Sequence, residues 1–204
     1  MQVFAMRIPV IPGIIKRRML INFRADSGVV KRLLPAPFHP RLHQGNAIAG
    51  VCLIRLEHIR PAGLPRLLGQ ASEKAAHRIA VEWDEGGIRR EGVYIPRRDT
   101  GSMLTYLAGG RVFPGEHSFA RFAVKEVGGR VDFTMKSSDH KMTVRVIGEE
   151  GGPFPETSCF SSLASASSFF EGGSLGYSIT RDQNRFDGLQ LRTLDWCVSP
   201  FQIS

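Results

Sequence analysis

The stretch GGRVFPGEH, residues 109–117, gathers several chemically active side chains in a short segment. Arg111, Glu116 and His117 supply a permanent cation, a carboxylate and an imidazole, the groups that bind anions and transfer protons. Glycine permits close backbone approach and Pro114 fixes its own φ, so the segment suits the wall of a ligand cavity. A turn that leads into a strand with solvated charges is the alternative interpretation.

The elements that would position this stretch are short strands with a few short helices. Strands are predicted over residues 17–24, 47–59, 75–83, 88–95, 118–127, 131–136, 141–147, 175–179 and 189–198, and helices over 28–34, 102–108 and 161–170. Pro96 is expected to end its strand, and Asp99 or Thr100 to cap the helix that follows. Many strands at short spacing favour a mainly antiparallel β fold. A barrel is the expected form because closure removes exposed edges, and one domain should span residues 1–204.

The charge pattern bears on the class of ligand. The formal net charge is +8 and the pI is about 9.9, but the arginines are scattered, without a long basic run or a nucleic-acid-binding motif. The sequence therefore argues against nucleic acid as a partner and favours a small anionic ligand, which guanidinium groups recognise well. Nucleotide-binding motifs and metal-ligand spacings are also missing, so no cofactor is expected.

Cysteine usage and the N-terminal residues bear on location. Three widely spaced cysteines, Cys52, Cys159 and Cys197, fit neither a disulfide framework nor a zinc site. Residues 1–20 are apolar, but two prolines interrupt them and no charged region precedes them, so neither a signal peptide nor a membrane span is predicted. A cytoplasmic protein is expected, and a homo-oligomer is left open.

The order of several motifs resembles the acetoacetate decarboxylase-like superfamily, and more closely its bacterial DUF2071-type proteins. These motifs are FRAD at 23–26, a short helix ending in LLP, a long apolar strand, VYIP, another short helix, GGRVFP, and the late FFEGGSLGYS. The resemblance implies a mainly β (α+β) fold. It further implies a cone-like antiparallel β-barrel with a few short helices around a cavity for a small carbonyl or carboxylate compound.

The resemblance assigns roles to individual residues. Arg24 in FRAD matches an arginine that lines the pocket near the substrate carboxylate. Glu73 falls near a pocket glutamate of the family, and His77 is close enough to compete for that place. Within GGRVFP, Arg111 and Phe113 are the most transferable residues.

The resemblance fails at the catalytic lysines. Pro114 is followed by Gly115 and Glu116, where the family has two lysines. Schiff-base chemistry needs an amine whose pKa is lowered by burial and by a second cation, and neither residue supplies one. Lys74 is the one lysine beside another candidate residue, but the adjacent Glu73 should hold it protonated. A Schiff-base decarboxylase is therefore not predicted.

Two hypotheses remain. In the first, the chain is a barrel that binds a small anionic or carbonyl metabolite through Arg24 and Arg111, with Phe113, Tyr94 and His77 in the wall. In the second, it is a lysine-independent lyase, hydratase or isomerase.

The second hypothesis assigns acid–base catalysis to Glu116, His117 or Glu73. Strand alternation places Glu116 and His117 on opposite faces, so at most one of them is expected to point inward.

Overall fold

A computed structural model describes residues 12–60, 65, 67, 69–108, 115–180, 185–191 and 196–204. In chain order its elements are β1 (Ile14–Ala25), α1 (Ser27–Leu33), β2 (His39–Pro40), β3 (Leu42–His43), β4 (Asn46–Ile59), β5 (Gln70–Glu85), β6 (Ile88–Thr100), α2 (Met103–Ala108), β7 (His117–Val127), β8 (Arg130–Ser137), β9 (Thr143–Glu150), α3 (Leu163–Glu171), the short 3-10 helix η2 (Gly172–Ser174), β10 (Leu175–Ile179), β11 (Phe186–Gln190) and β12 (Phe201–Ile203).

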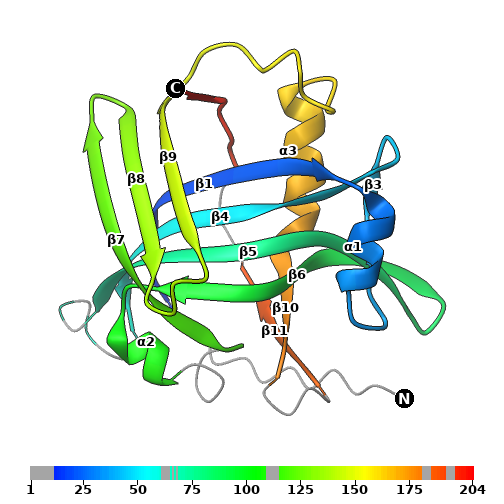
Figure 1. Ribbon diagram of the computed structural model, residues 1–204, viewed down its shortest axis with the longest axis horizontal. Coiled ribbons are helices and arrows are strands. Elements are labelled where there is room, and N and C mark those ends of the chain that lie inside the picture. The colour runs from blue at the N-terminus through cyan, green and yellow to red at the C-terminus, as the bar shows by residue number, and fades with distance from the viewer. Residues whose placement is uncertain are drawn as a thin grey trace.

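The described strands form one curled sheet with the order β1-β4-β5-β6-β7-β8-β9-β12. Most neighbours are antiparallel, but β6 pairs in parallel with both β7 and β10. In Figure 1, β7, β8 and β9 run steeply across the direction of β1, β4, β5 and β6, which makes the sheet a half-barrel. The predicted mainly β class with few short helices is confirmed.

The concave side of the curl holds the main core. Side chains on one face of β1, β4 and β5 meet side chains from β7, β8 and β9 there. The buried members of this cluster are Met19, Val51, Leu53, Ala75, Ala120, Val131, Phe133, Met135 and Val146. Because successive residues of a strand alternate between faces, this cluster fixes which residues must point the other way.

The opposite face of the sheet is covered by α3. Phe169 and Ala166 of this helix pack on Ile48 of β4 and Ala80 of β5, and Figure 1 shows α3 crossing these strands. A second cluster, built around the rings of Phe38, Trp83, Tyr94, Tyr177 and Phe186, buries the end of the sheet nearest β10 and β11.

Side chains cap the starts of the three described α-helices. Asp26 caps α1 by accepting a hydrogen bond from Val29 N at 2.7 Å. Before α2, however, the cap is Ser102, whose Oγ accepts from Thr105 N at 3.3 Å. Asp99 is instead buried in an ion pair. For α3, Ser162 Oγ accepts from Ser165 N.

Pro96 does not end its strand, so this expectation was wrong. β6 continues to Thr100, and the pairing of β5 with β6 shifts register between His77 and Ile79, opposite the position of Pro96. A bulge of this kind tolerates a residue without an N–H because the ladder is already interrupted there.

The predicted closing strand over residues 189–198 is also different. The strand β11 covers Phe186–Gln190, residues 196–200 are not in a strand, and β12 pairs with β9 further along. The remaining residues of that prediction, 192–195, lie outside the described part of the chain.

Candidate functional site

The neighbours Glu73 and Lys74 on β5 set the geometry of the site. Glu73 forms ion pairs with Arg17 and Arg55 on the face that carries the concave core. Lys74 lies on the other face, because adjacent residues of a strand point in opposite directions. The expected pairing of Glu73 with Lys74 is therefore not found.

Lys74 shares its face with Arg98 on β6 and His117 on β7. Arg98 is paired with Ala76, two residues beyond Lys74 on β5, and His117 is paired with Arg98 across the parallel β6–β7 ladder. Cross-strand partners point to the same side of a sheet, so three nitrogen-bearing side chains converge there. We call Lys74, Arg98 and His117 the cationic cluster.

Burial governs the protonation of this cluster. Burial, together with the charge of Arg98, lowers the pKa of Lys74 to about 8. Burial lowers the pKa of Arg98 to about 10, against the opposing charge of Asp187. The pKa of His117 is lowered to about 3 by burial and then by the charges of Lys74 and Arg98. At neutral pH His117 is thus an uncharged imidazole beside two cations.

Arg98 is the most constrained member of the cationic cluster. Its side chain is fixed by one hydrogen bond, from Nε to Ser178 Oγ at 3.1 Å, and Ser178 Oγ in turn donates to Ile95 O at 2.9 Å. Its Nη2 is buried and has no hydrogen-bond partner among the described residues. A buried guanidinium nitrogen without an acceptor is costly, so the position favours an acceptor from outside this set of residues.

Gly115 brings the stretch that precedes β7 against the cluster. It adopts φ +72°, and an added Cβ would lie 2.8 Å from Ser178 Cβ and 3.2 Å from Arg98 Nε. Its N–H donates to Asp187 Oδ2 at 3.1 Å. His117 follows two residues later, and its Nδ1 lies 3.2 Å from Gly115 O. Gly115 is therefore required both by its φ and by its close packing.

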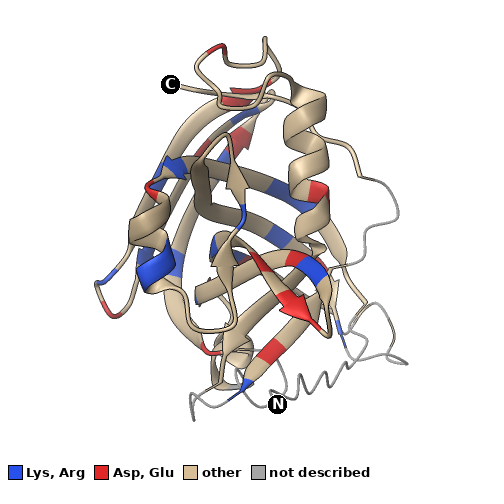
Figure 2. Ribbon diagram, turned by 90° about the vertical axis from the view of Figure 1, so that its right-hand side faces the viewer, with Lys and Arg blue, Asp and Glu red and all other residues tan. Residues whose placement is uncertain are grey.

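The electrostatic setting of the cluster is local. In Figure 2, Lys and Arg positions are spread over several strands and are interspersed with Asp and Glu positions. No continuous stripe of Lys and Arg positions is visible among the described residues in that view. An extended polyanion such as nucleic acid needs a longer track of positive charge than the cationic cluster supplies.

Glu73, which the sequence suggested as an acid–base catalyst, forms structural ion pairs. Its two carboxylate oxygens lie 2.5 Å from Arg17 Nη2 and 3.3 Å from Arg55 Nη1. Arg17 also pairs with Glu126 on β7. This network ties β1, β4, β5 and β7 together on the face opposite the cationic cluster.

His77 belongs to a second network on that same opposite face. Its Nε2 lies 3.0 Å from Asp99 Oδ2, and Arg97 contacts both Asp99 and Asp139. Burial alone would raise the pKa of Asp99, but hydrogen bonds from His77 and Arg97 and their charges outweigh it, and the pKa of Asp99 is lowered. The network stabilises the end of β6.

The other sequence candidates are dispersed. Arg24 is exposed at the end of β1, where it lines a large cavity described below. Tyr94 is buried in the aromatic cluster and contacts Phe38 with ring centroids 5.8 Å apart. Glu116 is exposed. Arg111 and Phe113 lie outside the described residues.

Sequence reasoning overlooked Arg98 and discounted Lys74. Arg97 and Arg98 are adjacent on β6, but Arg97 pairs with Asp99 and Asp139, whereas Arg98 belongs to the cationic cluster. A strand that continues past Pro96 would have indicated that Arg97 and Arg98 differ, because neighbouring residues of an extended strand face opposite sides of the sheet. For Lys74 the misleading signal was the adjacent carboxylate of Glu73.

The described ranges also bear on metal binding and on membrane insertion. Within them, no group of three His, Cys, Asp or Glu side chains is arranged to hold a metal ion. No helix in the same ranges has the length and apolar character needed to cross a bilayer. Cys52, Cys159 and Cys197 are free thiols.

The sequence matches a known protein family, and the fold is similar to that of a solved structure. The model of the DUF2071 family, described as "Uncharacterized conserved protein", matches residues 15–181. The chain belongs to the DUF2071 family. A search of curated protein sequences finds no match.

The fold of this DUF2071 chain is similar to that of a solved acetoacetate decarboxylase. An acetoacetate decarboxylase from Legionella pneumophila aligns with a TM-score of 0.55 and 13% identity, covering 98% of this chain and 79% of that one. An acetoacetate decarboxylase-like enzyme from Sphingomonas wittichii gives a TM-score of 0.44 and 16% identity, covering 72% and 59% of the two chains. The first similarity supports the acetoacetate decarboxylase-like fold expected from the sequence.

Proposed function

We propose that this protein binds a small carboxylate that also carries a carbonyl group, and that the cationic cluster is the binding site. The observation that carries the proposal is the buried guanidinium of Arg98, whose Nη2 has no acceptor among the described residues. A substrate carboxylate would supply that acceptor, and charge-assisted bonds of this kind are strong in a buried setting. The Legionella protein of similar fold is named for a keto acid, which agrees with this ligand class.

His117 complements Arg98 in such a site. With a pKa near 3, its imidazole is neutral at physiological pH, and one of its ring nitrogens can donate a hydrogen bond while the other accepts. A neutral imidazole can therefore hydrogen-bond a ligand carbonyl oxygen without adding a third charge. So low a pKa makes His117 a weak base, which disfavours the acid–base role considered from the sequence.

A second candidate function is amine catalysis by Lys74, and the lowered pKa of that residue favours it. With a pKa near 8, about a tenth of the Lys74 amine is neutral at pH 7. The neutral Nζ can attack a ligand carbonyl carbon and form a C–N bond; loss of water then leaves an imine. Burial and a neighbouring cation are the two influences that activate a lysine for this step.

Position as well as pKa supports the amine hypothesis. Gly115, where the resemblance places a lysine, packs against Arg98, and the charge of Arg98 acts on Lys74. Lys74 thus approaches from a neighbouring strand the region in which the missing amine is expected. The lysine-independent alternative lacks comparable support, since Glu73 lies on the opposite face and Glu116 is exposed.

Thermal unfolding with pyruvate, 2-oxobutyrate and acetoacetate tests the binding proposal. A ligand present at one hundred times its Kd should raise Tm by roughly 5–10 °C for a chain of this size. R98K keeps the charge but removes the planar fork, so the shift should largely disappear. R121Q, at an exposed position of β7, is the control and should keep it. No shift with any of the three compounds would exclude this ligand class.

Borohydride reduction distinguishes amine chemistry from simple binding. If Lys74 forms an imine with acetoacetate or pyruvate, reduction leaves a stable adduct on the peptide that contains Lys74, detected by mass spectrometry. K74M should abolish the adduct, and K125M, at an exposed position of β7, should not. Stabilisation by keto acids without any adduct would leave the binding function and reject the amine function.

A further inference from the structure

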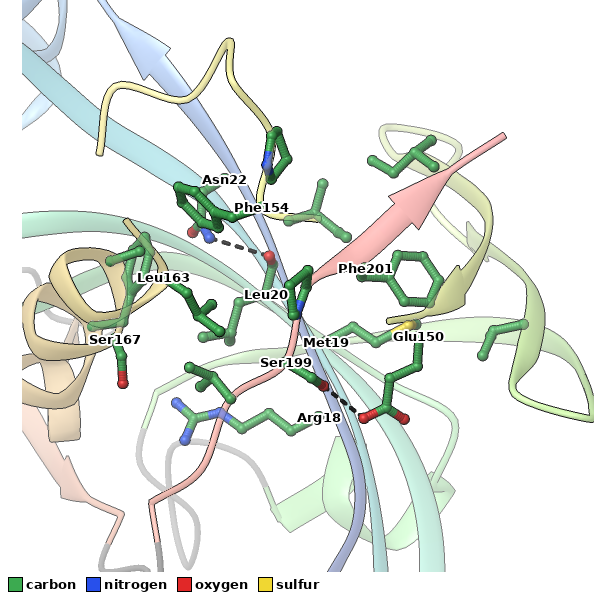
Figure 3. Close-up of a pocket in the computed structure, with 18 of the residues that line it drawn as sticks. Arg18, Met19, Leu20, Asn22, Glu150, Phe154, Leu163, Ser167, Ser199 and Phe201 are labelled. Carbon is green, nitrogen blue, oxygen red and sulfur yellow. Dashed lines mark hydrogen bonds between the residues drawn. The ribbon is translucent and has the colours of Figure 1, made fainter. Parts of the chain in front are cut away.

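A cavity of about 1010 Å³ lies apart from the cationic cluster, beside the edge strand β1. Its walls are β1, α3, the loop before α3, the turn between β7 and β8, and the segment 196–203. Figure 3 shows this space between the helix and the C-terminal segment. Neither Lys74, Arg98 nor His117 lines it.

Arg18 places a cation in the wall of this cavity. Its guanidinium carbon lies 5.2 Å from the centre of the Trp196 ring, which fixes the group by a cation–π contact. Its Nε is buried and has no hydrogen-bond partner among the described residues, and no described carboxylate pairs with it. In Figure 3 the Arg18 side chain extends towards the α3 side, whereas Met19 extends towards Phe201.

A second buried guanidinium strengthens the positive potential behind the wall. Arg78 Nη2 donates to Asn22 Oδ1 at 2.8 Å, and Asn22 Nδ2 donates to Leu20 O at 3.1 Å. Burial lowers the pKa of Arg78, and the nearby charge of Arg18 lowers it further. No described carboxylate forms an ion pair with either arginine, so the two charges repel each other without compensation from that part of the chain.

The lining combines further cations, namely Lys16, Arg17, Arg24 and Arg130, with many apolar side chains. Apolar side chains come from β1, α3, the loop before α3 and the C-terminal segment, namely Leu20, Phe154, Leu163, Phe170, Val198 and Phe201. The two carboxylates in the lining are already engaged, because Glu126 pairs with Arg17 and Glu150 accepts a hydrogen bond from Ser199 Oγ at 2.6 Å. The cavity thus places the Arg18 guanidinium next to apolar side chains, in a space large enough for a small ligand.

We propose that this cavity binds an amphipathic carboxylate, a medium-chain fatty acid or a compound of like shape, with its carboxylate on Arg18 and its chain between β1 and α3. Charge complementarity selects the anionic head, and the apolar side chains of the lining select the tail, since each buried methylene strengthens binding about fourfold. This site is independent of the function proposed for the cationic cluster.

Calorimetric titration of the full chain with decanoate tests the proposal. Decanoate should bind, while acetate, which lacks the tail, and decanol, which lacks the charge, should bind at least tenfold more weakly. R18Q should weaken decanoate binding about tenfold to hundredfold, the range expected when a charged hydrogen bond is removed. R121Q, which removes a charge outside the cavity, should leave the affinity unchanged.

Two further variants locate the bound molecule. L163W fills the cavity from α3 without changing its charge and should abolish binding even if R18Q proves too unstable to study. K74M should leave decanoate binding intact, which separates this site from the cationic cluster. The proposal is overturned if decanoate does not bind, if decanol binds equally well, if R18Q and L163W both bind like the wild type, or if K74M removes binding.

Discussion

Glu73 and Lys74 are adjacent along β5 but belong to different parts of the molecule. Glu73 is held by Arg17 and Arg55 on the side of the concave core, whereas Lys74 is partly buried near Arg98 on the other side. The sheet itself separates the carboxylate from the amine. For this reason a lysine that follows a glutamate directly in sequence has a lowered pKa.

Replacing Lys74 with methionine should reveal the cost of its burial. Between the folded pKa near 8 and the ordinary lysine pKa of 10.5, the unfolded chain binds a proton that the folded chain does not. The free energy of unfolding of the wild type therefore rises with pH across that window. K74M should be more stable at pH 7, by an amount on the order of 3 kcal/mol, and its advantage should shrink towards pH 10.5.

Urea unfolding of the two proteins at several pH values from 7 to 10.5 makes this comparison. Identical pH dependence of wild type and K74M would show that Lys74 has an ordinary pKa and would remove the basis of the amine hypothesis.

His117 should stay neutral in acid. Its pKa near 3 lies below the ordinary histidine pKa of 6.5, so between these values only the unfolded chain gains a proton. The free energy of unfolding therefore falls as pH falls through that window. H117N should lose stability less steeply there, by up to about 1.4 kcal/mol per pH unit. The measurement is nitrogen NMR of the imidazole, with H117N to assign the signal, and a midpoint near 6.5 would contradict the expectation.

The ion pair of Arg97 with Asp99 should be essential to the end of β6. The Asp99 carboxylate is fully buried, so R97M would leave it with His77 as its remaining partner among the described residues and should cost about 3 kcal/mol. The double variant R97M/D99N should recover part of that loss because the buried charge is gone. D139N, which removes only the exposed partner of Arg97, should change the urea midpoint little. A small effect of R97M would mean that water or another group compensates Asp99.

Gly115 offers a test of close packing against the cluster. G115A places a methyl group at positive φ and against Ser178 and Arg98, and it should lower the free energy of unfolding by an amount on the order of 2 kcal/mol. G45A is a matched control, because Gly45 has φ +78° but no atom within 4 Å of an added Cβ. Equal losses in the two variants would show that the contact with Arg98 contributes nothing.

Much of the fold could be predicted because its signals are local. Alternation of apolar and polar residues indicated most strands, and the helix predicted over residues 28–34 is found as α1. The parallel pairing of β6 with β7 could not be predicted, because it depends on which strand edge of the folded sheet is available to β7. The site was harder still. Arg98 escaped notice because Pro96 was expected to end the strand, and without an extended chain beyond it the faces of Arg97 and Arg98 could not be assigned.

The cavity beside Arg18 forms only when distant segments of the chain have come together. Arg18 and Trp196 are in contact in its wall but lie far apart in the sequence. Bringing such distant segments together carries a large loop-closure entropy, so contacts of this kind form after the local hairpins. The hairpins of β7, β8 and β9 should therefore assemble early, and the cavity should be among the last features to appear during refolding.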